Sequence, residues 1–272
     1  MDFTIITPSL NYGRYIGDCL GSVAAQQEVT LEHLVIDGGS TDETPDVTRQ
    51  FPHALFSQEP DKGMSDAINK GFARAKGQWV MWLNADDRLK PGALKAVKEF
   101  VTAHPEADVV YGAWNFIDGS GAFQRTMSLF PFQRRMLLYL GCYIGSTATF
   151  FNRSRVIDRG FLLNINFRYV MDGEYYARLA ANGMKFMYLP RILAEFRIHG
   201  DNISFRAHGA RTVDDCLVLQ KQYGEARAIR RAYGATWFSN ENWNSAVDAF
   251  LQLFFRVWKG FLKLFYRHRL QR

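Results

Sequence analysis

Short hydrophobic runs alternate with longer amphipathic segments over the first 112 residues of the chain. The runs are rich in Val, Ile, Leu and aromatic residues and have strand length, whereas the segments between them repeat apolar positions at helical spacing. The pattern predicts strands at residues 3–6, 31–36, 54–57, 78–83 and 109–111, and helices at residues 12–25, 64–75 and 92–103. Strands separated by helices are typical of right-handed βαβ units, so we expect an α/β fold with a mostly parallel sheet flanked by helices.

The pattern changes after residue 112. Residues 113–170 contain shorter, mixed segments, which we interpret as added strands and loops that shape a second binding surface. Beyond them the sequence predicts a helix at 173–183, strands at 185–189 and 193–197, and helical structure from residue 206 onward. We therefore expect a domain at 1–205, with halves at 1–112 and 113–205, followed by a helical C-terminal extension at 206–272.

The net charge of +6 is unevenly distributed along the chain. Residues 1–205 hold 21 basic and 22 acidic side chains, whereas residues 206–272 hold 12 basic and 5 acidic ones. The basic extension points to an acidic partner surface, either a membrane or a nucleic acid. The slightly acidic remainder disfavours nucleic acid, and a hydrophobic content of 47% excludes wholesale disorder.

Cysteine usage and the absence of targeting signals indicate a cytoplasmic protein. The three cysteines show no paired spacing, which argues against a disulfide framework or a zinc site and fits a reducing compartment. No signal peptide is visible, and no apolar run reaches the ~18 residues that span a bilayer. A nucleotide-dependent oxidoreductase is disfavoured because no G-x-G-x-x-G motif follows the first predicted strand.

The most informative segment is the predicted strand 78–83 and the sequence Asn84-Ala85-Asp86-Asp87 that follows it. Carboxylates at the carboxyl end of a buried strand lie where open α/β sheets bind their ligands. Hard oxygen ligands in that position suit Mg²⁺ or Mn²⁺, which usually bind together with substrate phosphates. The alternative is that Asp86 or Asp87 caps the helix that begins near residue 92.

Three further loops with polar side chains follow predicted strands, at residues 7–12, 37–42 and 59–70. Each loop alone is a weak signal because Asp-Gly and Ser-Thr-Asp sequences are common in turns and caps. In a parallel sheet, however, all four loops converge on one edge. Their convergence predicts a binding site for a ligand with hydroxyl and phosphate groups.

The same four segments carry a family resemblance. Thr7-Pro8-Ser9, the stretch 35–42, the stretches 61–63 and 66–71, and the stretch 82–87 closely resemble the family 2 inverting glycosyltransferases with a GT-A fold. The resemblance continues at Met171-Asp172-Gly173-Glu174 and at Arg197-Ile198-His199, and it covers roughly residues 1–205. The form of the third segment is similar to bacterial enzymes that build surface polysaccharides.

The resemblance implies a nucleoside-diphosphate sugar donor, with a UDP-sugar as the first expectation, and Mn²⁺ or Mg²⁺ as cofactor. Asn84-Ala85-Asp86 occupies the position of the family's Asp-x-Asp motif, so Asp86 is the expected metal ligand and His199 a second one. A structural role for His199 is the alternative. The residues expected to bind the nucleotide-sugar are Thr7, Pro8, Ser9, Tyr12, Asp37, Gly38, Ser40, Asp61, Lys62, Asp66, Asn69, Asn84, Ala85, Asp86 and Asp87.

Asp172 aligns with the family's catalytic base. Inverting sugar transfer needs one carboxylate to accept the proton of the attacking hydroxyl group. The alternative is that Asp172 caps the helix predicted to begin at residue 173. Glu174 is expected to contact the acceptor, which the resemblance suggests is a saccharide or a polyprenyl-diphosphate-linked saccharide.

Residues 243–269 are predicted to form an amphipathic helix with large aromatic residues on one face and basic residues on the other. Such a helix is typical of segments that lie in the plane of a membrane surface, and we expect peripheral binding to the inner face of the cytoplasmic membrane. The alternative is that the apolar face packs on the catalytic domain or on a second subunit of a homodimer. A different class of function is a non-enzymatic module that binds membrane or nucleic acid through this tail, and it would not require Asp86 or Asp172.

Overall fold

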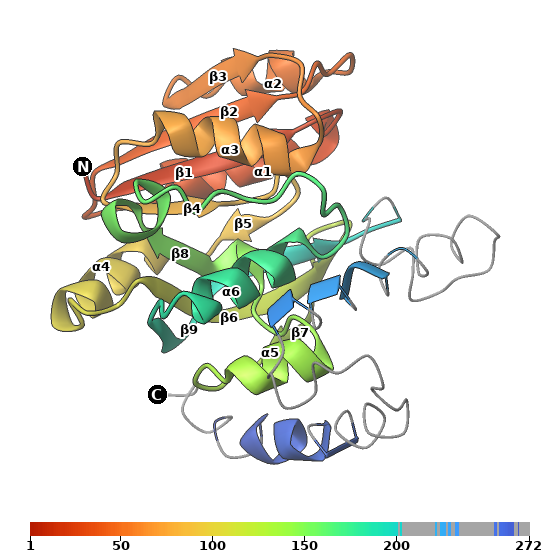
Figure 1. The fold of residues 1–272 in the computed structure, drawn as a ribbon. Helices are drawn as coiled ribbons and strands as arrows, with labels where there is room; N and C mark the ends of the chain where they lie inside the picture. Colours follow the sequence, from red (N-terminus) through yellow and green to blue (C-terminus); the bar gives the residue numbers. More distant parts are fainter. Residues whose placement is uncertain are drawn as a thin grey trace.

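The computed structural model of the 272-residue chain describes residues 1–200, 202, 221, 224–226, 228, 229, 232, 233, 253, 254, 256–263 and 266. Within residues 1–200 the elements follow one another as β1 (Phe3–Ser9), α1 (Gly13–Ala24), β2 (Leu31–Asp37), α2 (Thr44–Arg49), β3 (Ala54–Gln58), α3 (Met64–Arg74), β4 (Trp79–Trp82), β5 (Arg88–Leu89), α4 (Ala93–Ala103), β6 (Val109–Asp118), β7 (Phe123–Met127), α5 (Arg134–Leu140), η1 (Ser146–Ala148), β8 (Thr149–Asn152), η2 (Arg153–Ile157), α6 (Met171–Ala181) and β9 (Phe186–Ile198). They build one sheet with the strand order β3-β2-β1-β4-β8-β6-β9-β5, and β7 pairs with β6 (Figure 1).

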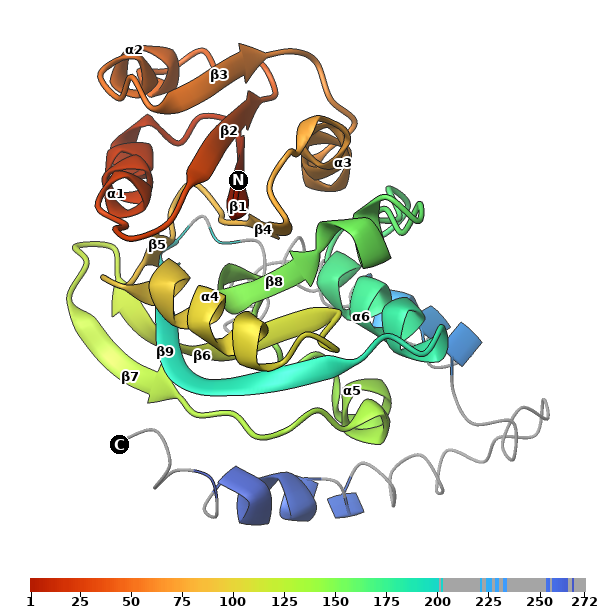
Figure 2. The same ribbon diagram turned by 90° about the vertical axis from the view of Figure 1, so that its left-hand side faces the viewer.

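The first half of the sheet is parallel, as the alternation of strands and helices predicts. β2 pairs in parallel with β1 and β3, and β1 pairs in parallel with β4. All seven residues of β1 are buried because helices cover both faces. Figure 2 shows α1 and α2 on one side of these strands and α3 on the other. The carboxyl ends of β1, β2, β3 and β4 therefore lie along one edge, together with the loops that follow them.

Helix α3 packs closely on β1 because Gly71 has no side chain. A Cβ atom at Gly71 would lie 2.5 Å from Cγ2 of Ile6. The α3 side chains Ala67, Ile68 and Phe72 are buried against the sheet. This packing fixes the position of the loop at residues 59–63, which leads into α3.

The second half of the sheet is mixed. β8 pairs antiparallel with both β4 and β6, whereas β9 pairs in parallel with β6. The strands predicted separately at 185–189 and 193–197 are one continuous strand, β9, so that prediction was wrong. Pro190 interrupts the hydrophobic pattern, but the pairing with β6 shifts register between Tyr111 and Trp114 and accommodates it as a bulge.

Part of the C-terminal extension lies against the second half of the sheet. Residues 256–263 are helical and lie near α5 (Figure 1). The indole N–H of Trp258 donates a hydrogen bond to Oε1 of Gln133 at 3.3 Å, and Leu262 and Tyr266 pack on the main hydrophobic core. The two ends of the predicted helix 243–269 and the predicted boundary near residue 205 lie outside the described residues. In the part of the chain that is described, no helix is both long and apolar enough to cross a bilayer.

Candidate active site

The loop after β2 folds around the carboxylate of Asp37. This side chain is fully buried, and its oxygens accept hydrogen bonds from the N–H groups of Gly39 and Ser40 at 3.0 and 2.7 Å. Ser40 Oγ also donates to it at 2.6 Å, and Gln58 Nε2 donates at 3.2 Å. Asp37 therefore shapes the loop from within, and a contact to the nucleotide stays a prediction.

At the end of β1 the predicted residues differ in what their side chains contact. Thr7 and Pro8 are buried, and the Thr7 hydroxyl lies 2.8 Å from Nε2 of His33. Burial lowers the pKa of His33 to about 3, so this is a contact between neutral groups inside the sheet. The Ser9 hydroxyl is buried and has no partner among the described residues. Ser9 therefore has a hydroxyl group free to bind a ligand, whereas Thr7 has a structural partner.

The loop after β1 is joined to the loop after β2. Ser40 Oγ accepts a hydrogen bond from the Asn11 N–H at 2.7 Å, and Asn11 Oδ1 accepts one from the Thr41 N–H at 2.9 Å. The Tyr12 N–H donates to Thr44 Oγ1 at 2.9 Å. These bonds hold Tyr12, from the loop after β1, close to the loop of Gly38 and Ser40 at one edge of the sheet.

Asp61 reaches the same edge from the loop after β3. Its Oδ1 accepts a hydrogen bond from the Gly63 N–H at 2.7 Å. Its Oδ2 lies 2.6 Å from the position that a Cβ atom at Gly38 would occupy. The lack of a side chain at Gly38 thus permits the close approach of these two loops.

The other residues predicted from this segment serve its local structure. Asp66 Oδ2 accepts a hydrogen bond from the Lys62 N–H at 3.0 Å and lies 3.7 Å from Nζ of Lys70. Asn69 Nδ2 donates a hydrogen bond to the backbone oxygen of Leu163 at 2.9 Å, and Asn69 Oδ1 accepts one from the Leu163 N–H at 2.9 Å. Asp66 therefore stabilises the turn into α3, and Asn69 ties α3 to a loop of the second half. The Lys62 side chain is exposed.

The fourth loop meets the end of β9. β5 pairs antiparallel with β9, with Arg88 opposite Glu195, so the residues just before β5 lie beside those that end β9. Asp86 is only 4% exposed, and its Oδ2 lies 2.9 Å from Nε2 of His199. Asn202 Nδ2 donates to the same oxygen at 3.1 Å. The sheet thus brings together the two residues predicted as metal ligands, although 113 positions separate them in the chain.

Asp87 points into the protein. It is fully buried, accepts hydrogen bonds from the Arg197 N–H at 3.0 Å and from Asn84 Nδ2 at 3.2 Å, and has a pKa raised well above its ordinary value. The main cause is burial, and the adjacent Asp86 charge adds to it. Asp87 thus holds the loop in shape, and the neighbouring Ala85 is also buried.

Arg197 is a functional candidate for which the sequence pattern suggested no role. The side chain is 1% exposed. Its guanidinium group donates to the backbone oxygen of Asp86 at 2.9 Å, to that of Gly119 at 3.2 Å and to the carboxylate of Asp18 at 2.5 Å. It also lies over the ring of Tyr15, 5.1 Å from the ring centre. The only sequence signal for Arg197 was its place in the Arg197-Ile198-His199 segment that resembles the family. No sequence signal pointed to its partner Asp18.

The side chains at this edge fit a divalent cation. Asp86 offers a carboxylate oxygen and His199 an imidazole nitrogen, a combination that suits Mn²⁺ better than Mg²⁺. The Asn84 Oδ1 atom is buried and has no partner among the described residues. No group of three or more His, Cys, Asp and Glu side chains capable of holding a metal occurs in the described ranges. A cation here would therefore take further ligands from a bound diphosphate and water, as is usual for such ions.

The predicted base Asp172 lies in the first turn of α6. The helix begins at Met171, two residues earlier than predicted, and its N-cap residue is Val170, which makes no side-chain cap hydrogen bond. Asp172 Oδ1 accepts a hydrogen bond from the Gly173 N–H at 2.7 Å. Burial raises the pKa of Asp172 to about 6, which is closer to neutrality than an ordinary carboxyl group and suits a general base.

Glu174 contacts residues of the protein itself. It is 2% exposed, and Nε of Arg178 donates to its Oε1 at 2.8 Å. The hydroxyl of Tyr233 donates to the same oxygen at 2.9 Å. A direct acceptor contact by Glu174 stays a prediction, but its carboxylate already has two intramolecular partners.

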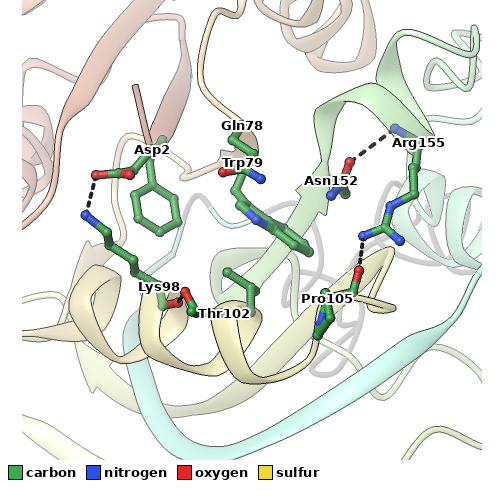
Figure 3. Close-up of a pocket in the computed structure, with 10 residues that line it drawn as sticks. Asp2, Gln78, Trp79, Lys98, Thr102, Pro105, Asn152 and Arg155 are labelled. Atoms are coloured by element: carbon green, nitrogen blue, oxygen red, sulfur yellow. Dashed lines mark hydrogen bonds and ion pairs between the residues drawn. The ribbon is translucent and has the colours of Figure 1, made fainter.

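A cavity of about 280 Å³ lies at the opposite edge of the sheet, near the amino ends of β1 and β4 (Figure 3). Its two basic side chains are occupied: Lys98 Nζ donates to Asp2 at 2.9 Å, and Arg155 donates to the backbone oxygens of Pro105 and Ala107. None of the predicted site residues lines this cavity. The candidate active site is therefore the loop cluster at the carboxyl ends of the strands.

Residues 4–161 match the protein family described as "Glycosyl transferase family 2". A PGL/p-HBAD biosynthesis glycosyltransferase from Mycobacterium bovis is 37% identical over 139 residues, which cover 47% of this chain and 54% of that protein. The chain thus spans about half the length of this curated relative.

Two solved structures share the fold. The crystal structure of S. aureus TarS residues 1–349 in complex with UDP-GlcNAc has a TM-score of 0.66 at 19% identity and covers 94% of this chain and 71% of that one. The mannosyltransferase PcManGT from Pyrobaculum calidifontis, in complex with GDP-Man and Mn²⁺, has a TM-score of 0.56 at 17% identity and covers 97% and 84% of the two chains. The expected GT-A fold is confirmed. The sheet is parallel in its first half, as predicted, whereas its second half is mixed.

Proposed function

Because the chain belongs to glycosyl transferase family 2, we propose that it transfers a sugar from a nucleoside-diphosphate sugar to a hydroxyl group of an acceptor, with inversion at the anomeric carbon. The product would be a bacterial polysaccharide or another glycan. The observation that best supports this activity is the meeting of Asp86 and His199 at the carboxyl edge of the sheet. The loops that follow β1, β2 and β3 lie along the same edge, where open α/β sheets bind their ligands.

The donor would lie along the edge formed by β1, β2 and β4. The free hydroxyl of Ser9, the exposed backbone around Gly38 and the Asp61 carboxylate offer hydrogen-bonding groups for the base and ribose. A UDP-sugar and a GDP-sugar are the first donors to test, because the structural neighbours were solved with UDP-GlcNAc and GDP-Man.

The cofactor proposed is Mn²⁺ or Mg²⁺, held by Asp86 and His199. When bound, the cation would neutralise charge on the diphosphate of the donor. Arg197 supports the site from behind, because its guanidinium group binds the backbone oxygen of Asp86. The Tyr15 ring, 4.7 Å from the His199 ring, limits the orientations that the imidazole can adopt.

Asp172 would act as the general base. Its carboxylate takes the proton of the acceptor hydroxyl while that oxygen forms a bond to the anomeric carbon. At the same time the bond between the sugar and the diphosphate breaks, and the nucleoside diphosphate leaves with the bonding electrons. A pKa of about 6 leaves most Asp172 side chains ionised, and able to accept a proton, at neutral pH.

Association with an anionic membrane surface is part of the proposal. The helical residues 253, 254 and 256–263, which we call the tail helix, include Leu253, Val257 and Phe261, whose side chains are 62%, 70% and 61% exposed. Lys263 lies on the opposite, half-buried side, with Nζ 3.6 Å from Sδ of Met127. An exposed apolar face on a basic segment is the arrangement expected of an in-plane membrane helix. By binding the inner face of the membrane, this helix would bring the enzyme close to a lipid-linked acceptor.

The activity is tested by thermal stabilisation with UDP, GDP, dTDP and CDP, each with and without Mn²⁺. A ligand at ~100 times its Kd adds about 2.7 kcal/mol to the free energy of unfolding. We expect a metal-dependent rise in melting temperature for one nucleotide, its loss in Asp86→Asn, and its retention in Asp172→Asn. Glu106→Gln serves as the control, because the exposed Glu106 side chain follows Pro105, which lines the cavity at the opposite edge of the sheet. Folded protein that responds to none of the nucleotides would refute the proposal.

Membrane binding is tested by sedimentation with vesicles of phosphatidylglycerol and phosphatidylcholine. We expect binding to the anionic vesicles and its loss in Val257→Asp. Phe123→Asp replaces a side chain of similar exposure, 61%, on β7 and should still bind. A stable dimer in solution that Val257→Asp dissociates, with no vesicle binding by the wild type, would assign the face to a second copy of the chain instead.

A further inference from the structure

Three residues of the C-terminal extension contact the start of α6, the helix that carries Asp172. They are Glu225, Ile229 and Tyr233, which we call the C-terminal clamp. All three are helical in the structure and lie four residues apart. On an α-helix, residues at this spacing lie on one face, so the three side chains can contact the same surface together.

Glu225 binds the backbone that leads into α6. One carboxylate oxygen accepts a hydrogen bond from the Arg168 N–H at 3.0 Å, and the other accepts from Tyr169 and Val170 at 2.9 and 3.0 Å. The first N–H groups of a helix lack partners within the helix, and its N-terminus favours negative charge. Val170 makes no side-chain cap hydrogen bond, and Glu225, from a distant part of the chain, fixes the backbone of the three residues that precede the helix.

The other two clamp residues contact the first turn of α6 itself. Ile229 is 7% exposed, and its Cδ1 lies 3.9 Å from the position of a Cβ atom at Gly173. The Tyr233 hydroxyl donates to Glu174 Oε1 at 2.9 Å, and the Tyr233 backbone oxygen accepts a hydrogen bond from Arg134 at 2.8 Å. The clamp thus holds the residues before and after Asp172.

We propose that the C-terminal clamp completes the active site by positioning Asp172, with Glu225 as the main positioning residue. The inference rests on the proposed function, because it assigns the extension a role in that same reaction. The family match ends at residue 161, so the clamp lies outside the matched segment. Among the printed contacts of the described residues, none joins a clamp residue directly to a predicted donor residue, and those residues lie between residues 7 and 87.

This separation predicts which kinetic constant changes. A misplaced base slows the chemical step, whereas the affinity for the donor depends on groups that the clamp does not touch. A displacement of about 1 Å from the reactive geometry can lower a rate roughly 100-fold. We therefore expect Glu225→Ala to lower kcat about tenfold or more and to leave the KM for the donor within about twofold.

The experiment compares the full-length wild type with Glu225→Ala, Glu225→Gln and Tyr233→Phe. Lys221→Gln is the matched control, because Lys221 is exposed one helical turn before Glu225. Release of UDP from UDP-GlcNAc and of GDP from GDP-mannose, with Mn²⁺ and water as the acceptor, gives kcat and KM without knowledge of the natural acceptor. Thermal stabilisation by UDP and GDP reports donor binding separately.

The expected order of kcat is wild type and Lys221→Gln, then Glu225→Gln, then Glu225→Ala, with nucleotide stabilisation equal in all. The amide of Glu225→Gln keeps an oxygen that accepts a hydrogen bond, so this variant should rescue part of the rate. Equal kcat in all variants of an active wild type would overturn the role of the clamp alone. No turnover and no nucleotide binding by the wild type would instead refute the proposed function. If Glu225→Ala does not fold, the inference is tested with Glu225→Gln and Tyr233→Phe. A kcat equal to that of Lys221→Gln in both of these variants would overturn it.

Discussion

Replacement of Asp172 by Asn should make the protein more stable at neutral pH while it abolishes sugar transfer. Burial raises the pKa of Asp172 from its ordinary value of 3.8 to about 6. Between those values the folded protein holds a proton that the unfolded chain has released. Stability therefore falls as pH rises through this window and stays lower above it. Asn carries no charge and escapes this loss.

The magnitude follows from the shift of about two pKa units, because each unit corresponds to about 1.36 kcal/mol. The free energy of unfolding of Asp172→Asn should exceed that of the wild type by up to about 3 kcal/mol near pH 8. At about 2–4 °C per kcal/mol for a domain of this size, the melting temperature rises by about 6–12 °C. The amide oxygen of the Asp172→Asn variant can still accept the Gly173 N–H, so that hydrogen bond is retained.

The assay is thermal unfolding of both proteins near pH 4 and near pH 8, with nucleotide release measured in parallel. The gain should be present near pH 8 and mostly lost near pH 4, because the wild-type carboxyl group is then protonated in the fold and partly protonated in the unfolded chain. Asp118→Asn provides a control of opposite sign, since the Ser120 hydroxyl is the main cause of a lowered pKa at Asp118. A difference in melting temperature between Asp172→Asn and wild type that does not change with pH would refute the reasoning.

Three further substitutions test the packing around the site. Arg197→Met removes the donor to the backbone oxygens of Asp86 and Gly119 and should lower the free energy of unfolding by about 1–3 kcal/mol. No measurable loss in urea titrations would contradict this. Gly38→Ala places a Cβ atom 2.6 Å from Asp61 Oδ2. It should weaken nucleotide binding, measured as a smaller rise in melting temperature with nucleotide, and change the melting temperature of the free protein less. Unchanged nucleotide affinity would argue against a role of this loop contact. Gly71→Ala places a Cβ atom 2.5 Å from Ile6 and should cost about 1–3 kcal/mol of stability, detectable by denaturant unfolding; a stabilised protein would show that α3 can move away from β1.

The sequence indicated the positions of the site better than the partners of its residues. The buried strand that ends at Trp82 and its parallel neighbours could be predicted from local hydrophobic runs, and parallel register then brings Asp37 and Asp86 to one edge. By contrast, the two bonds between Asn69 and Leu163 depend on how loops of the second half fold back. Local periodicity carries no information on such distant partners.

The same limit explains one wrong prediction in the second half, the division of β9, and the intramolecular partners of Glu174 that the sequence did not reveal. Pro190 interrupts the apolar pattern, so β9 was predicted as two strands, but a bulge against β6 preserves its continuity. Glu174 was predicted to contact the acceptor because it follows Asp172 on the same helix. A helix wheel does not reveal that Arg178, one turn later, pairs with it, nor that Tyr233 from the extension reaches it.

The pairing of β5 with β9 also bears on how the protein is made. Asp87 accepts a hydrogen bond from the N–H of Arg197, which lies 110 positions later in the chain. Asp86 contacts His199, which lies 113 positions later. A ribosome that adds about 5–20 residues per second needs several seconds to synthesise that stretch. Throughout that interval the parallel strands at the N-terminus can already fold, while two adjacent carboxylates at their edge still lack these partners. Closure of the acidic loop is thus a late, long-range step in the folding of the nascent chain.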